Sequence, residues 1–342
     1  MAFEILRTGA RFIVLEISDG GKYNTLSKYE YEIVPEGNGI IPRPQTIKAS
    51  TDRCINLVTG LYPDMNYKIR ITGDGEDFCT CFHTLFESAT LDVRQFGAVG
   101  DGIHDDTMAI QTAINVCPEN GRILLQKGRY AVTAIFIKGH INIEIEDGAE
   151  LIGTKDKSKL PILPGIVRSY DENCEYNFAS WEGNPLRQYA SMITGFDASD
   201  CIIYGHGTLN GNAGFDDWWN IDKEHFTVAR PNMFFVNNCS NIMLAGVLVK
   251  NSPCWTLHPY FSKNMLMVCA ELVVIIPNEN PSSCRCRTRS GMPSNAFTSP
   301  ARSTDFFLKN RINPGICQNL TPDIFMSSRA DLSLLAAKSI CW

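Results

Sequence analysis

A repeated pattern of short apolar strands and polar turns is the feature that most constrains the fold of this chain. The segments "GRILLQKGRY" (121–130), "DCIIYGHGTLNG" (200–211) and "SNIMLAGVLVKNS" (240–252) share one order: a polar turn, a few apolar or alternating residues, then Gly or Asn. Asn241 and Asn264 each precede such a strand and lie 23 residues apart, and the 41 residues from Gly205 to Gly246 approximate two such spacings. Several short strands per period in the low twenties predict a stacked solenoid, here a parallel β-helix.

A helix is predicted at the start of this solenoid. In "FGAVGDGIHDDTMAIQTAI" (96–114) the glycines permit an irregular loop, and Asp105 or Asp106 is placed to cap a helix N-terminus. The apolar residues that follow recur at helical spacing, which predicts a helix over about 106–116. We expect it to cover the open N-terminal end of the solenoid, and capping explains the paired aspartates without a catalytic role.

The first 88 residues predict a separate small β-sandwich. The runs "YEYEI" (29–33), "YKIRI" (67–71) and "FCTCFHT" (78–84) alternate with period two, and "GDG" (73–75) predicts a hairpin turn between the last two. Leu61 to Tyr67 has the L-x-P-x-x-x-Y spacing of a tyrosine corner, as in fibronectin type III-like sandwiches. A generic β-sandwich over residues 1–88 remains the alternative, and no catalytic constellation is visible there.

Composition narrows the classes of partner. A net charge of −6 disfavours a nucleic-acid binder, and no apolar run reaches the roughly 18 residues of a membrane span. Glu4 and Arg7 interrupt the stretch where a secretory signal would be apolar, so we expect a cytoplasmic protein whose 13 cysteines are reduced. The pairs Cys79-x-Cys81 and Cys284-x-Cys286 lack a second pair at zinc-site spacing, so neither a metal nor another cofactor is expected.

Several segments resemble the family 28 glycoside hydrolases, the polygalacturonase group, and most of all its bacterial branch with an N-terminal fibronectin-like module. The resemblance runs from about Leu91 to Asn264. It implies a right-handed parallel β-helix over residues 91–276 and inverting hydrolysis of α-1,4-galacturonan by aspartates without a metal. The implied partner is a pectic oligosaccharide or polysaccharide. The segments are "FGAVGDGIHDDTMAIQTAI", "GRILLQKGRY", "DGAELIG", "WEGNPLRQYASMI", "GHGTLNGNAG", "RPNMFFVNNCSNIMLAG" and "NSPCWTLHPYFSKN".

The catalytic motifs that the resemblance implies are missing from their expected places. Family members carry Asn-Thr-Asp, then Asp-Asp, Gly-His-Gly and Arg-Ile-Lys; after Asn264 neither Asn-Thr-Asp nor Asp-Asp occurs, and Arg-Ile-Lys occurs nowhere. Asp305 follows a Thr but lies nearly two coils late. His206 sits in a Gly-His-Gly that precedes the expected first motif, which favours a coil turn. We therefore assign no catalytic residue.

Three further residues are candidates for the site. Asp216 and Asp217, in "GFDDWW", match the second motif by letters only, and a solvated loop is the favoured interpretation. His258 lies beside the expected floor of the substrate cleft, so it is a candidate for substrate contact, with coil packing as the alternative.

The last part of the chain, residues 277–342, differs in composition from what precedes it. It holds two glycines in 66 residues and eight Lys or Arg against four Asp or Glu, and "RCRTRSG" shows no strand alternation. We expect an atypical, poorly ordered tail that leaves the β-helix truncated. A reading-frame shift near residues 265–280 would explain these changes, and a divergent C-terminal cap is the alternative.

Three functions follow from these observations. The first is a polygalacturonase-like hydrolase, inactive in this chain because the motif aspartates are absent. The second is a non-catalytic β-helix that binds carbohydrate or protein. The third is a tailspike-like structural piece, since "FGAVGDGxxDDT" also occurs in other pectin-lyase-like β-helices.

Overall fold

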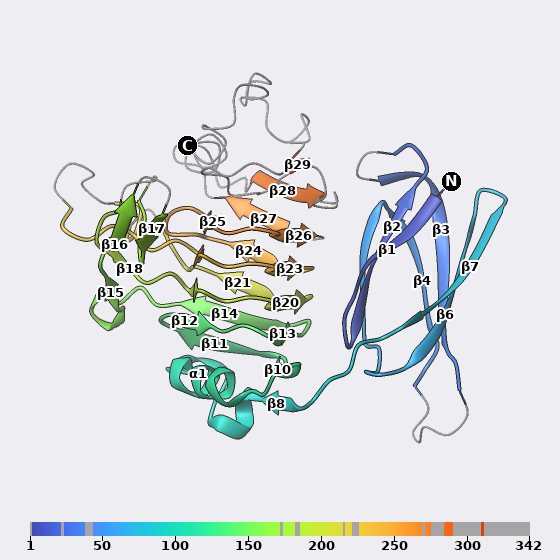
Figure 1. Cartoon of the computed structure of the whole chain (residues 1–342), viewed down its shortest axis with the longest axis horizontal. Coiled ribbons are helices and arrows are strands. Elements are labelled where there is room, and N and C mark those ends of the chain that lie inside the picture. The colour runs from blue at the N-terminus through green and yellow to red at the C-terminus, as the bar shows by residue number, and fades with distance from the viewer. Residues whose placement is uncertain are drawn as a thin grey trace. The chain divides into compact units, whose positions relative to one another are not determined.

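The computed structural model describes residues 2–21, 24–37, 44–171, 174–181, 185–214, 216–220, 226–268, 271–274, 284–289 and 309–310. The chain divides into two compact units, Met1–Ser88 and Ala89–Trp342, and each is described by itself. Regular structure in both units is almost entirely β (Figure 1). The predicted all-β class, a parallel β-helix preceded by a small β-sandwich, is confirmed.

Two antiparallel sheets make up the described part of the first unit. One is ordered β1-β2-β5 and the other β4-β3-β6-β7. The alternating runs bury every second side chain between the sheets, as Tyr67, Ile69 and Ile71 do along β6. The strands are β1 (Ala2–Thr8), β2 (Phe12–Ser18), β3 (Asn24–Pro35), β4 (Ile47–Arg53), β5 (Ile55–Thr59), β6 (Asn66–Gly73) and β7 (Glu76–His83).

Two local predictions in this unit can be compared with the structure. Asp74 and Gly75 both have positive φ between β6 and β7, which is the tight hairpin turn that "GDG" predicts. The backbone N–H of Tyr62 donates to the Tyr67 hydroxyl at 2.9 Å, which is the contact of a tyrosine corner. The assignment of this unit as fibronectin type III-like stays a prediction that this contact supports.

Three parallel sheets form the walls of the second unit, and successive coils visit them in turn (Figure 1). Sheet I contains β8 (Thr90–Asp92), β10 (Gly121–Leu125), β13 (Ile141–Ile145), β20 (Ile202–Gly205), β23 (Met243–Ala245) and β26 (Leu266–Val268). Sheet II contains β9 (Asp101–Asp105), β11 (Gly128–Val132), β14 (Ala149–Gly153), β21 (Thr208–Asn210), β24 (Leu248–Lys250) and β27 (Glu271–Val274). Sheet III contains β12 (Ile135–Ile137), β19 (Ile193–Phe196), β22 (Phe234–Asn237) and β25 (Leu257–Tyr260).

The length of a coil varies more than the sequence pattern predicts. Asn264 pairs with Asn241, 23 residues earlier, which confirms the predicted spacing. Asn241 in turn pairs with Asp200, 41 residues earlier, and β20 pairs directly with β23. The interpretation of 41 residues as two periods is therefore wrong. It is one coil, lengthened because the chain leaves the solenoid between β21 and β22.

Excursions of this kind leave the coil between sheet II and sheet III. The longer one, residues 154–192, carries the 3-10 helix η2 (Lys157–Lys159) and two antiparallel pairs of short strands. The shorter one covers residues 211–233. The strands of the longer excursion are β15 (Ile162–Leu163), β16 (Ile166–Asp171), β17 (Cys174–Asn177) and β18 (Gln188–Tyr189).

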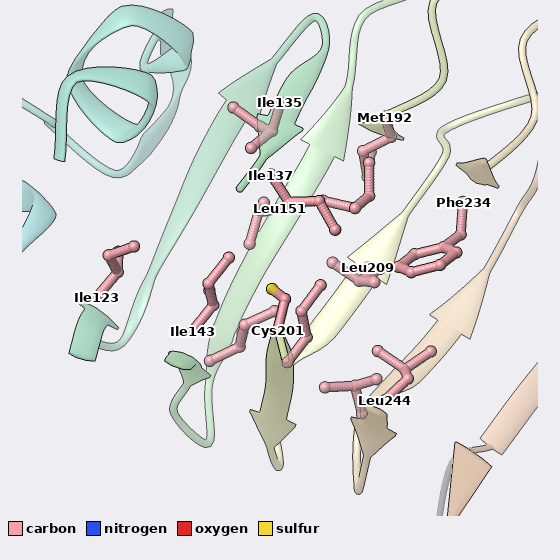
Figure 2. Close-up of a cluster of buried hydrophobic side chains, with 14 of the residues drawn as sticks. Ile123, Ile135, Ile137, Ile143, Leu151, Met192, Cys201, Leu209, Phe234 and Leu244 are labelled. Carbon is pink, nitrogen blue, oxygen red and sulfur yellow. The ribbon is translucent and has the colours of Figure 1, made fainter. Parts of the chain in front are cut away.

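Stacked apolar side chains fill the interior of the β-helix. In sheet I the register aligns Ile123 with Ile143, Ile143 with Ile203, and Ile203 with Leu244, and all four are buried. Figure 2 shows Ile123, Ile143 and Leu244 within this cluster. Burial of each such side chain contributes about 1.5–3 kcal/mol, and each layer depends on its neighbours, so no coil is stable alone.

The helix α1 (Thr107–Val116) lies at the first coil, close to the predicted range. Its buried Ile110 and Ile114 join the core of the β-helix. Asp106 is the N-cap residue of α1, but its side chain makes no capping hydrogen bond. Asp105 accepts from the Thr107 N–H at 3.0 Å, while Asp106 accepts from the N–H groups of Val99 and Gly100 at 2.7 and 3.1 Å. Asp106 thus fixes the glycine loop, and a 3-10 helix, η1 (Val93–Phe96), precedes that loop.

Two columns of left-handed residues mark the corners between sheet III and sheet I. Asp200, Asn241 and Asn264 have φ of 57°, 56° and 55°, and their side chains are linked by hydrogen bonds of 2.9 and 3.0 Å. In the second column Asn238, with φ of 55°, donates to Asp197 at 2.5 Å. Short Asn and Asp side chains tolerate this conformation and bond locally, which explains their positions.

Phe261 continues the second column in the next coil, with φ of 45°. For a bulky L-residue this conformation costs about 1–2 kcal/mol of free energy. We expect Phe261→Asn to raise the free energy of unfolding by about 1 kcal/mol, measured by urea denaturation. Phe261→Ala is the matched control, because it removes the ring contact with Tyr260 without adding tolerance of positive φ. An Asn variant less stable than the Ala variant would contradict this explanation.

The parallel pairing of sheet II ends at β27. There β28 (Cys284–Arg289) pairs antiparallel with β27, and β29 (Lys309–Asn310) pairs antiparallel with β28. Residues 285–289, "RCRTR", lack strand alternation, yet their backbone is extended here, because the edge of β27 offers N–H and C=O groups to any extended segment. The predicted poor order of the tail otherwise lies outside the described residues, as does Asp305.

Candidate functional site

The outward face of sheet III carries an array of aromatic and polar side chains. Along β22 and β25 the residues alternate, so that Phe234 and Leu257 enter the core while Phe235 and His258 face outward. The ring centroids of Phe235 and His258 lie 5.2 Å apart. An outward face is normally solvated, but His258 is only 5% exposed. This part of the sheet is therefore a covered site.

His258 is held in a neutral, apolar setting. The Trp255 ring lies 4.4 Å from it and the Tyr260 ring 5.9 Å, between centroids. Its Nδ1 lies 3.0 Å from the Asn232 amide nitrogen, which can only donate, so Nδ1 accepts and the proton of the neutral ring is on Nε2. Burial lowers the pKa of His258 from 6.5 to about 3. The ring is thus uncharged at neutral pH.

This lowered pKa predicts a loss of stability in acid. In the unfolded chain the imidazole takes up a proton near pH 6.5, and in the folded chain only near pH 3, so each pH unit between these values favours unfolding by about 1.4 kcal/mol. We expect His258→Gln to flatten the decline of unfolding free energy from pH 6.5 to 4. The exposed His206→Gln is the control and should leave the decline unchanged. Parallel profiles for the chain and His258→Gln would contradict the assignment.

Arg230 lies beside this array, in the loop before β22. Its guanidinium carbon is 4.3 Å from the centroid of one Trp219 ring and 5.2 Å from that of Trp181. Trp181 packs in turn with Trp255 in one buried cluster. We refer to Trp181, Trp219, Arg230, Trp255 and His258 together as the Trp–Arg–His cluster. It brings a cation and three indole rings together over sheet III.

Two hydrogen bonds hold the backbone and the side chain of Arg230 in place. Its carbonyl accepts from the Gln188 side chain at 2.6 Å, and its Nη1 donates to the Trp218 carbonyl at 3.5 Å. Both excursions from the coil therefore hold the residue, since Gln188 belongs to the longer one and Trp218 to the shorter. Only 3% of Arg230 is exposed.

Asp217 is a structural residue of the shorter excursion. The Lys155 ammonium lies 2.5 Å from its carboxylate, and the N–H groups of Gly214 and Trp218 donate to it. Burial alone would raise the pKa of Asp217, but these donors outweigh burial and hold the pKa below its usual value. The solvated-loop interpretation fits Asp216, which is exposed, and fails for Asp217, because Lys155 reaches it from the neighbouring excursion.

The candidate residues named from the sequence thus lie in different parts of the second unit. His258 lies in the Trp–Arg–His cluster, and Asp217 adjoins it through Trp218. His206 is exposed in the turn between β20 and β21, where sheet I meets sheet II. The sequence analysis did not single out Arg230 or Asn232. Their signal was a lone arginine, followed by Pro, just ahead of the apolar run "MFFV".

Metal ligands, cysteines and membrane-spanning helices are the other features that bear on a functional site. Within the described ranges, no three His, Cys, Asp or Glu side chains converge as metal ligands. Among the cysteines whose side chains the structure describes, none forms a disulfide. None of the helices in the described part of the chain combines the length and apolar character that a membrane crossing requires.

Comparison with known proteins shows what the β-helix of this chain is similar to. The family model described as rhamnogalacturonase A/epimerase, pectate lyase-like, matches residues 90–162. The solved family 28 exopolygalacturonase of Yersinia enterocolitica superposes with a TM-score of 0.56 at 18% identity, over 79% of this chain and 58% of that chain. At this identity the superposition shows a shared fold.

Two curated relatives extend the comparison. A probable polygalacturonase from Vitis vinifera is 26% identical over 204 residues, which are 55% of this chain and 39% of the relative. An exo-poly-alpha-D-galacturonosidase from Dickeya chrysanthemi is 34% identical over 164 residues, 47% of this chain and 25% of the relative. The matched part therefore spans two fifths or less of either relative.

Proposed function

This chain carries a β-helix of the family 28 glycoside hydrolase type, and we propose that it serves pectin degradation with α-1,4-linked galacturonan as its substrate. The Trp–Arg–His cluster is the observation that carries the proposal. Indole rings present flat apolar faces to sugar rings, and a guanidinium pairs with a carboxylate, which every unit of galacturonan carries.

The chemistry available at this cluster is binding rather than proton transfer. An inverting glycosidase needs one carboxylic acid to protonate the leaving oxygen and one carboxylate to activate water. His258 is neutral with a pKa of about 3, and Asp217 is engaged with Lys155. The purely binding alternative is not favoured, since the relatives reported above are named as hydrolases. We therefore assign the cluster to substrate recognition within a hydrolase scaffold.

Binding of galacturonan can be measured directly, because three tryptophans lie in the cluster. We expect trigalacturonate to change the intrinsic tryptophan fluorescence saturably, and a neutral galactose trisaccharide to give a much weaker response. The unfolded chain in urea controls for optical artefacts. Equal responses to both sugars, or no saturable response to either, would contradict the proposed substrate.

A further inference from the structure

Arg230 differs from the half-buried Arg11 and from the exposed Arg70 in what its guanidinium contacts. Arg11 presents its Nε and Nη2 edge to Glu87 at 2.8–3.0 Å. Arg70 presents the same edge to Asp77, with its Nε 2.9 Å from the carboxylate. In the described part of the chain no carboxylate lies on Arg230, and its buried Nε has no acceptor. The Nε that binds a carboxylate in Arg11 and Arg70 therefore has no partner in Arg230.

An unpaired buried cation is costly, and the surroundings of Arg230 offset only part of the cost. A guanidinium leaves water with a penalty of several kcal/mol unless it is paired. Stacking on Trp181 and Trp219 recovers some of it through cation–π attraction, and Nη1 reaches one carbonyl. These contacts place two indole rings and one backbone carbonyl against the guanidinium and leave its Nε without a partner.

We propose that Arg230 is a carboxylate anchor that binds a hexuronate unit of the substrate through its Nε and Nη2 edge. The proposal rests on the proposed function and deepens it by naming the residue that reads the acid group. A planar guanidinium held beside two indole rings suits bidentate pairing with a planar carboxylate. Trp219 is only partly buried, whereas Trp181 is buried, so a rotation of Trp219 is the smallest movement that admits the ligand.

The test compares free and esterified uronates. We expect the chain to bind trigalacturonate about 10- to 100-fold more tightly than its fully methyl-esterified form, since a charge-assisted bidentate pair is lost on esterification. Arg230→Gln should weaken binding of the free acid to the level of the ester and leave the ester unaffected. Arg230→Lys should keep only part of the preference. Retention of the full preference by Arg230→Gln, or its absence from the unaltered chain, would overturn the proposal.

Two controls keep the outcome decisive. If Arg230→Gln fails to fold, as judged by circular dichroism, thermal shifts of the unaltered chain replace it: galacturonate should raise the melting temperature and galactose should not. Lys155→Gln is a matched charge removal near the cluster and should not abolish the preference for the acid. If glucuronate and galacturonate both bind through Arg230 while trigalacturonate does not, the anchor stands and the galacturonan assignment falls. If trigalacturonate binds equally to Arg230→Gln, the anchor falls and the galacturonan assignment stands.

Discussion

The purified chain is expected to release no measurable reducing ends from polygalacturonate. The sequence lacks the Asn-Thr-Asp and Arg-Ile-Lys motifs and has no Asp-Asp after Asp217. Inverting hydrolysis needs both an acid and a water-activating carboxylate, and each contributes about 10²–10⁴-fold to the rate. Loss of both removes most of what distinguishes the site from bulk water. The measurement is a reducing-end assay on galacturonan oligomers, with and without EDTA.

Variants separate the ways in which this expectation can fail. A version of the chain with the four motifs restored should be active and insensitive to EDTA. Turnover by the unaltered chain that disappears in Asp216→Asn would make the exposed aspartate of the shorter excursion catalytic. Turnover lost only in Asp305→Asn would make the tail a relocated catalytic segment. Asp217→Asn must be judged against its melting temperature, because it breaks the ion pair with Lys155.

The second large effect concerns the coil turn at Gly205. This residue has φ of +127°, and a Cβ built on it would lie 2.1 Å from the carbonyl oxygen of Ile145 in the adjacent coil. Both the conformation and the clash with backbone exclude a side chain. We expect Gly205→Ala to lower the free energy of unfolding by at least about 3 kcal/mol, or to prevent folding. Urea denaturation followed by circular dichroism measures it.

The neighbouring residue provides the control for this prediction. His206→Ala changes an exposed side chain in the same turn and should alter stability by no more than about 0.5 kcal/mol. It also tests the motif interpretation, since a catalytic histidine would affect turnover in the active, motif-restored version and a turn residue would not. A Gly205→Ala variant as stable as the unaltered chain would show that adjacent coils can separate locally at little cost.

Much of the fold could be predicted because its periodicity follows from local residue preferences at the corners and along the strands. Asn241 and Asn264 mark their corners because a left-handed conformation favours Asn, and the strands between such corners alternate. The excursions could not be placed in the same way. Residues 154–192 and 211–233 lie outside the parallel register of the stacked coils, so a 41-residue coil imitates two short ones. The pairing of Asn241 with Asp200 spans an excursion, so the local sequence pattern could not predict it.

The candidate site was harder to predict than the fold. His258 could be proposed from its place beside the expected floor of the substrate cleft, but its partner Asn232 lies one coil earlier. Arg230 acts through rings from two excursions, Trp181 in one and Trp219 in the other, which no local pattern connects. A strand at Cys284–Arg289 was missed because edge pairing requires an extended backbone and sets no rule for side chains.

The position of the excursions has a consequence for how such a protein can change. From β10 onward only two or three residues separate successive strands at the corners between sheets I and II, as at Gln126–Lys127, and a longer insertion there would disturb the strand register. At the corner between sheets II and III the chain departs for residues 154–192, returns, and the stacking continues in register. Replacement of one excursion by another of different length therefore leaves the packing of the stacked core unchanged. In this architecture the excursion residues of the proposed ligand site, Trp181, Trp219 and Arg230, can therefore evolve separately from the stacked core, whereas His258 lies on a strand of the coil and stays with it.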